Sequence, residues 1–251
     1  MKRICLPVAL LISVLLFNCD PPRKPQEPEI TLDKALKLYK DTIEKTLAKY
    51  ERLQKVVDTI PTLDSATGKL TGLDTRLDFY SGHYGSYNMN VNALIMHEED
   101  LQDITREKGT PPLRIQHNNT VNYAGYIMQD TRRWKEEPKV CAGYIEGFGK
   151  RLPLYKYILV VRTLNYRAPE LLTNNSFNVG IYKGQGMLFR LADAAYLGGF
   201  PFEAVSSMEV EGSPDDMEKW LHNDMWENAT NMLHSNIRKH CVSVKLEEHE
   251  P

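Results

Sequence analysis

A long apolar stripe with helical spacing constrains the fold more than any other feature of this 251-residue chain. Its members follow one another at intervals of three or four: Leu32, Leu36, Tyr39, Ile43, Leu47, Tyr50, Leu53, Val57 and Ile60. Because this spacing places side chains on one face of an α-helix, the segment predicts a single helix of about 28 residues, or about 42 Å. Thr31 is the expected N-cap, and Pro61 ends the run.

The stripe has two interpretations. It can pack against the protein's own sheet, or it can form a coiled-coil seam with a partner. Two tyrosines in the stripe and fewer than five heptads favour packing within the chain.

The clearest strand is predicted over Leu154 to Thr163, where five consecutive residues are apolar on both faces, as in a covered central strand. Further strands are expected in these segments: Met89 to Met96, Tyr123 to Met128, Met187 to Leu191 and Phe200 to Val205. A short helix is expected from Glu98 to Arg106. The run Ser213-Pro214-Asp215-Asp216 predicts the start of a second long helix, of about 25 residues. Strands between two terminal helices indicate an α+β domain with a largely antiparallel sheet.

The N-terminus has the pattern of an export signal. Lys2 and Arg3 precede an apolar stretch from Ile4 to Phe17. Fourteen helical residues span about 21 Å, which is short of the roughly 30 Å bilayer core, so the stretch is typical of a signal peptide rather than a permanent span.

The residues Leu16-Phe17-Asn18-Cys19 resemble the lipobox of a bacterial lipoprotein signal peptide, in the looser form found in spirochaete lipoproteins. The resemblance implies cleavage before Cys19 and a lipid anchor, carrying fatty acids such as palmitate, on that cysteine. It leaves open whether the inner or the outer membrane holds the anchor. The alternative is an ordinary secretory signal that is cut elsewhere.

The chain then divides into a signal peptide at residues 1–18, a tether at 19–30 and one domain at 31–251. Asp20 to Glu29 contains four prolines among charged residues, so the tether should be extended over roughly 30 Å.

The cysteines allow one disulfide. If Cys5 leaves with the signal peptide and Cys19 carries lipid, Cys141 and Cys241 remain. Export to an oxidising compartment favours pairing them, and closing a loop of about 100 residues would contribute at most about 4.7 kcal/mol. Two separately buried thiols are the alternative.

Several motifs suggest catalysis or metal binding but lack the necessary companions. The run Tyr166-Arg167-Ala168-Pro169-Glu170 resembles the end of a protein-kinase activation segment, yet no kinase phosphate loop or catalytic loop precedes it, so we treat it as a coincidence. Gly143 to Lys150 has the wrong spacing for a phosphate loop and predicts a turn or bulge. No metal site is expected from His97 or from the C-terminal group of His222, His234, His240 and Cys241, whose spacing does not place them on one helix face.

Composition excludes one class of function. The chain has 31 Lys or Arg against 33 Asp or Glu, without the basic surplus of a nucleic-acid binder. We therefore expect a membrane-tethered lipoprotein of the bacterial cell envelope, on the periplasmic or surface side, with a binding, assembly or surface-contact role, no cofactor, and the membrane and a protein as its candidate partners. The alternatives are an extracytoplasmic hydrolase with a site built from distant residues, and a structural protein that associates through residues 32–60.

Overall fold

The structure is a computed structural model, and it describes residues 30–67, 70, 76–79, 91–104, 112–113, 120–172, 176–211, 216–241 and 244–245. The helices in this part of the chain are α1 (Leu32–Val57), α2 (Glu98–Ile104), α3 (Thr120–Gln129), α4 (Thr131–Glu136), α5 (Pro138–Arg151), the 3₁₀ turn η1 (Leu152–Leu154) and α6 (Met217–His240). The strands are β1 (Leu77–Asp78), β2 (Ala93–His97), β3 (Tyr157–Arg167), β4 (Glu170–Leu171), β5 (Phe177–Asn178), β6 (Ile181–Arg190), β7 (Ala195–Val205) and β8 (Val244–Lys245).

A four-stranded sheet in the order β2-β3-β6-β7 forms the centre of the molecule. Strands β3, β6 and β7 are antiparallel, whereas β2 runs parallel to β3. Two small pairs accompany it, the parallel pair β1-β8 and the antiparallel pair β4-β5. The predicted α+β class is therefore confirmed, with one parallel strand pair in a mostly antiparallel sheet.

The sheet is covered on both faces, as its central apolar strand predicts. One face carries Leu94, Ile158 and Phe189 in register, and the helices α1, α3 and α5 cover it. The other face carries Ile95 and Leu159, and α6 covers it. Because neighbouring residues of a strand point to opposite faces, the same strands contribute to two separate cores.

Helix α1 packs inside the protein. The Thr31 hydroxyl accepts a hydrogen bond from the Lys34 amide at 3.4 Å, as expected of an N-cap. From the stripe, Ile43, Tyr50 and Val57 are completely buried in the core between α1 and the sheet. Packing within the chain is thus confirmed for the buried members of the stripe, whereas association with a partner through residues 32–60 stays a prediction.

Two local predictions are wrong. Residues 123–128 belong to helix α3, where Val121, Ala124 and Ile127 are buried at helical intervals. The neighbouring tyrosines favour strand structure, but this packing decides the outcome. Residues 143–150 are the interior of helix α5 rather than a turn or bulge. A Cβ atom at Gly149 would lie 2.3 Å from the ring of Tyr39, so the glycine serves the close approach of α5 to α1.

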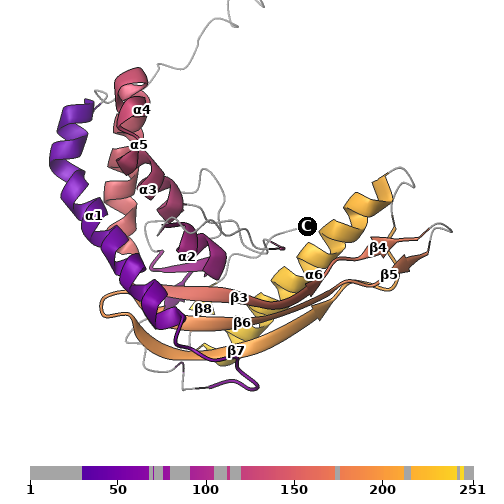
Figure 1. Ribbon diagram of the computed structural model, residues 1–251. Helices are drawn as coiled ribbons and strands as arrows, with labels where there is room; N and C mark the ends of the chain where they lie inside the picture. Colours follow the sequence, from indigo (N-terminus) through magenta and orange to yellow (C-terminus); the bar gives the residue numbers. More distant parts are fainter. Residues whose placement is uncertain are drawn as a thin grey trace, which may run out of the picture.

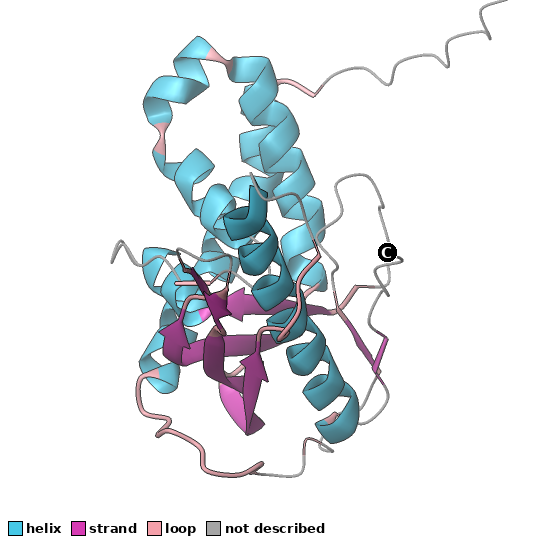
Figure 2. Ribbon diagram, turned by 90° about the vertical axis from the view of Figure 1, so that its right-hand side faces the viewer, coloured by secondary structure: helices cyan, strands magenta, loops and turns pink. Residues whose placement is uncertain are grey.

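The helices on the first face form an elongated unit, here called the helical arm and comprising α1, α3, α4 and α5 (Figure 1). The N-terminal end of α1 and the helix α4 lie at the far end of this arm from the sheet. The view in Figure 2 places α6 across the other face of the sheet. The arm and the β4-β5 pair therefore extend from the sheet in different directions.

A polar group at the junction joins the arm to the sheet. The guanidinium of Arg162 on β3 donates to the Val57 and Ile60 carbonyls at the end of α1, at 2.8 and 2.7 Å. It also forms a two-point ion pair with Glu98, the first residue of α2. Both side chains are mostly buried, so one arginine holds α1, α2 and β3 together.

The turn between β6 and β7 contains an ion pair as well. Arg190 donates to the two carboxylate oxygens of Asp193 at 3.0 and 2.7 Å, and the Ala195 amide donates to the same carboxylate. The hydrogen bonds from Arg190 are the main cause that lowers the pKa of Asp193 to about 2.

Candidate functional site

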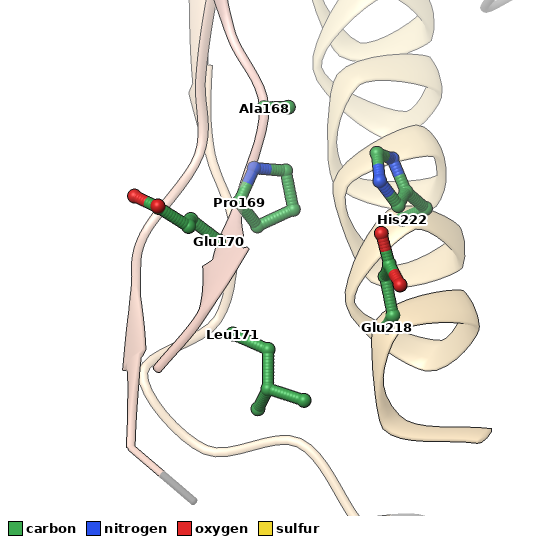
Figure 3. Close-up of a pocket in the computed structure, with 6 residues that line it drawn as sticks. All are labelled: Ala168, Pro169, Glu170, Leu171, Glu218 and His222. Carbon is green, nitrogen blue, oxygen red and sulfur yellow. The ribbon is translucent and has the colours of Figure 1, made fainter. Parts of the chain in front are cut away.

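A cavity of about 540 Å³ lies between the β4 segment and the first turns of α6. Figure 3 shows the six residues that line it: Ala168, Pro169, Glu170, Leu171, Glu218 and His222. Four of them come from the segment after β3 and two from α6, so the cavity exists only because the helix packs against the sheet. Its volume lies within the range of small-ligand sites.

The α6 side of the cavity is polar. Glu218 and His222 are one helical turn apart, so both side chains lie on the face toward β4 (Figure 3). Leu221, Met225 and Ala229 on the same helix are buried against the sheet and fix the position of the helix. The chain thereby holds a carboxylate and an imidazole over the cavity.

The opposite side is mainly apolar. The Pro169 ring and the Leu171 side chain point toward the helix, whereas the Glu170 carboxylate points away from it (Figure 3). Glu170 accepts a hydrogen bond from the Asn178 side chain at 3.3 Å, which ties it to the β5 strand. The cavity therefore has one apolar side and one polar side.

A glycine allows this arrangement. A Cβ atom at Gly180 would lie 2.8 Å from Cδ of Pro169 and 2.9 Å from the sulfur of Met225. The connection between β5 and β6 consequently fits between the proline and α6 only because residue 180 lacks a side chain. The run that resembles a kinase segment is thus the break between β3 and β4 and the apolar side of the cavity.

Glu218 and His222 are available to a ligand. Within the part of the chain that the structure describes, neither side chain has a hydrogen bond or an ion pair. By contrast, the nearby Lys183 and Glu203 pair with each other at 3.0 Å. A carboxylate that is not neutralised by the protein can accept a charged partner without breaking an existing contact.

A network beside the cavity joins β7 to α6. The Ser207 hydroxyl and amide donate to the two carboxylate oxygens of Asp224 at 2.6 and 2.7 Å. The Asn228 side chain donates to the Val205 carbonyl and to Asp224. Because the serine bonds directly to a carboxylate, this group is not the serine–histidine–aspartate relay of a hydrolase.

The predicted disulfide is not formed. Cys141 and Cys241 are both free and buried. Cys141 belongs to α5 in the helical arm, whereas Cys241 belongs to the core under α6, on the opposite face of the sheet. A disulfide requires Cα atoms about 5.5 Å apart, and the intervening sheet keeps the two sulfurs from meeting. Burial raises the pKa of Cys241 to about 12, so this thiol is protonated at neutral pH.

The histidines that the structure describes lie in different parts of the fold. Among the described residues, no group of three or more His, Cys, Asp or Glu side chains could hold a metal ion. The ring of His240 stacks on Phe200 with centroids 5.4 Å apart, and burial lowers its pKa. His97 is completely buried at the end of β2. These positions are structural in character.

Charge is divided unevenly between the two ends of the molecule. Residues 30–57 and 120–151, which contain the helical arm, have 13 Lys or Arg and 8 Asp or Glu, a net charge of +5. Residues 201–227, which contain the end of β7 and the first half of α6, have eight Asp or Glu and a single lysine. The α6 side of the cavity, with Glu218 and His222, belongs to this acidic segment.

Sequence reasoning did not find the cavity. Its two sides are separated by about 50 residues, and of the α6 pair only His222 entered the sequence analysis, as a residue from which no metal site is expected, whereas no local pattern marks Glu218. The lipidation residue Cys19 and residues 20–29 of the tether lie outside the described residues, as do Ser213, Pro214 and Asp215; Asp216, the last residue of that run, is the N-cap of α6. No helix within the described ranges is long and apolar enough to cross a bilayer.

Comparison of this chain with protein families, with curated proteins and with solved structures found no match, so its geometry and chemistry carry the functional argument.

Proposed function

We propose that this chain is a lipid-anchored lipoprotein of a bacterial cell envelope that binds a partner outside the cytoplasm through the cavity between β4 and α6. The proposal combines the predicted anchor at Cys19 with the geometry of the folded domain. We favour binding because the cavity has an apolar side and a polar side that suit a ligand; of the groups that could attack a bond, the six lining residues supply carboxylates and one imidazole but no hydroxyl or thiol.

The observation that carries the proposal is the separation of the two ends. The tether would join the chain at the start of α1, at the far end of the helical arm, whereas the cavity lies beside β4 and α6 (Figure 1). Helix α1 alone is 26 residues, or about 39 Å, long. A domain held in this way would present its cavity away from the lipid.

The charge distribution supports the same orientation. Lipid surfaces rich in anionic headgroups attract basic segments, by about 1 kcal/mol for each Lys or Arg close to the surface. The helical arm has the positive net charge, and the α6 side of the cavity belongs to the acidic segment 201–227. The basic helical arm would therefore face the anionic lipid, and the acidic segment of α6 would face away from it.

The anchor is tested by changing Cys19 to Ala in the producing bacterium. We expect the variant to move from the membrane fraction to the soluble fraction and to lose the acyl mass of the mature N-terminus. The matched control is Cys5→Ala, which removes a cysteine from the predicted signal peptide and should leave fractionation unchanged. Membrane retention of the Cys19→Ala protein without any acyl mass in the parent protein would refute the anchor.

A further inference from the structure

We infer that the cavity between β4 and α6 accepts a cationic side chain, a lysine or arginine of a partner polypeptide. The inference rests on the proposed binding role of the cavity and adds the chemistry of its ligand. It follows from the two unlike sides of the cavity, from a Glu218 carboxylate that has no partner among the described residues, and from the charge of the segment that contains it.

The apolar side suits the stem of such a residue. Pro169 and Leu171 point into the cavity, and Leu171 is 38 % exposed. Lysine and arginine have three or four methylene groups that pack along apolar surface while the charged end reaches polar groups. The stem would cover the apolar side of the cavity.

The polar side suits the charged end. The Glu218 carboxylate lies across the cavity from Pro169 and has no ion pair within the described residues. His222, one turn further, offers a ring nitrogen as a hydrogen-bond acceptor when neutral. A cation bound between them would pair with the Glu218 carboxylate, which has no cationic partner among the described residues.

The surrounding charge also favours a cation. The N-terminus of α6 has a partial positive charge of about one half, which alone would disfavour a cation. Glu218 and Asp216 at that terminus outweigh it, and six further acidic residues of 201–227 extend the negative potential. The same surplus disfavours anionic ligands such as phosphates or nucleic acid.

The cavity is larger than one side chain, so the ligand is a peptide segment. A volume of about 540 Å³ leaves room for the residues on either side of the lysine or arginine. Leu172, which follows β4, is 37 % exposed, and Val205, the last residue of β7, is 46 % exposed. Small or apolar neighbours in the partner would contact them.

The test compares two peptides on the purified full-length protein. The first is acetyl-Ala-Ala-Lys-Ala-Ala-amide, and the second replaces lysine with norleucine, which keeps the stem but lacks the charge. Amide chemical shifts in two-dimensional NMR report the binding position and the affinity. We expect the lysine peptide to shift residues 168–171 and 218–222 and to bind about fivefold more tightly than the norleucine peptide, since an exposed ion pair contributes up to about 1 kcal/mol.

A pair of variants on α6 isolates the carboxylate. Glu218→Gln should reduce affinity for the lysine peptide about three- to fivefold and leave the weak norleucine binding unchanged. The matched control is Glu227→Gln, because residue 227 is nine positions further and lies on the opposite face of the helix. It removes the same charge from the acidic region but should not alter binding by more than a small factor.

Three results would overturn the inference. They are equal affinity for both peptides, equal effects of the two glutamate variants, and no shift in the cavity residues at millimolar peptide. The second would mean that only the general negative potential attracts the peptide. Because Cys19→Ala changes the anchor and not the cavity, fractionation and peptide binding fail independently, and each proposal is judged on its own result.

Discussion

The arginine at the junction of arm and sheet offers the sharpest test of the fold. Arg162 on β3 makes hydrogen bonds to two carbonyls at the end of α1 and a two-point ion pair with Glu98. The side chains are only 18 % and 13 % exposed. Replacing Arg162 with Met keeps the stem but leaves a mostly buried carboxylate without its cation.

The magnitude follows from these contacts. Breaking a buried pair by removing one partner costs about 3–5 kcal/mol, and the residual exposure of Arg162 and Glu98 places the expected value near the lower end. The two α1 carbonyls also lose donors, at about 1 kcal/mol each, but these effects overlap with the first. We expect Arg162→Met to lower the free energy of unfolding by about 3 kcal/mol.

The assay is urea denaturation followed by far-ultraviolet circular dichroism, with Glu98→Gln and the double variant completing a cycle. Because the two side chains act through each other, the double variant should lose about 1–2 kcal/mol less than the sum of the single variants. The control is Lys45→Met, which removes a 2.8 Å ion pair with Asp41 on the exposed face of α1 and should leave stability unchanged. A loss below about 1 kcal/mol for Arg162→Met, with additive single effects, would refute the reasoning.

The remaining predictions concern helix packing, thiols and acid. Gly149→Ala should destabilise the protein by about 1–3 kcal/mol in thermal unfolding because its methyl group meets α1, whereas Gly143→Ala, with nothing within 4 Å, should stabilise α5 by up to about 1 kcal/mol. A disulfide reagent should find Cys141 and Cys241 unreactive until the protein unfolds, and an unreduced mass two units below the dithiol form would contradict the structure. Since the folded pKa of Asp193 is about 2, its ion pair should stabilise the protein above pH 4 and lose that effect as pH falls toward 2; the melting temperatures of Asp193→Asn and the parent protein should converge over that range.

The sequence predicted the elements whose patterns were long and consistent. The stripe of α1 repeats over seven turns, so its helix and its buried face could be inferred from spacing alone. Strand β3 was found because five successive apolar residues require cover on both faces. The strands β6 and β7 were found in part, since each extends beyond its apolar centre into polar residues.

The errors have physical reasons. Tyr123 and Tyr126 favour strand locally, but helix α3 is decided by what its other side contacts. The glycines of α5 favour a turn when only the local sequence is considered. Gly149 instead allows close packing against Tyr39, a residue more than a hundred positions away in the sequence. Two further features join segments that are distant in the sequence: the ion pair of Arg162 with Glu98, and the cavity beside α6. Local sequence patterns do not predict such contacts.

The division of the interior by a single sheet has a consequence for motion. Helix α6 is held by one core and the helical arm by the other, so the two layers can loosen independently, and amide exchange in α6 need not follow exchange in α1. A peptide bridging β4 and the first turn of α6 would suppress fraying at that helix end. Peptide binding would then slow amide exchange near residue 218, while the exchange rates in the helical arm would stay the same.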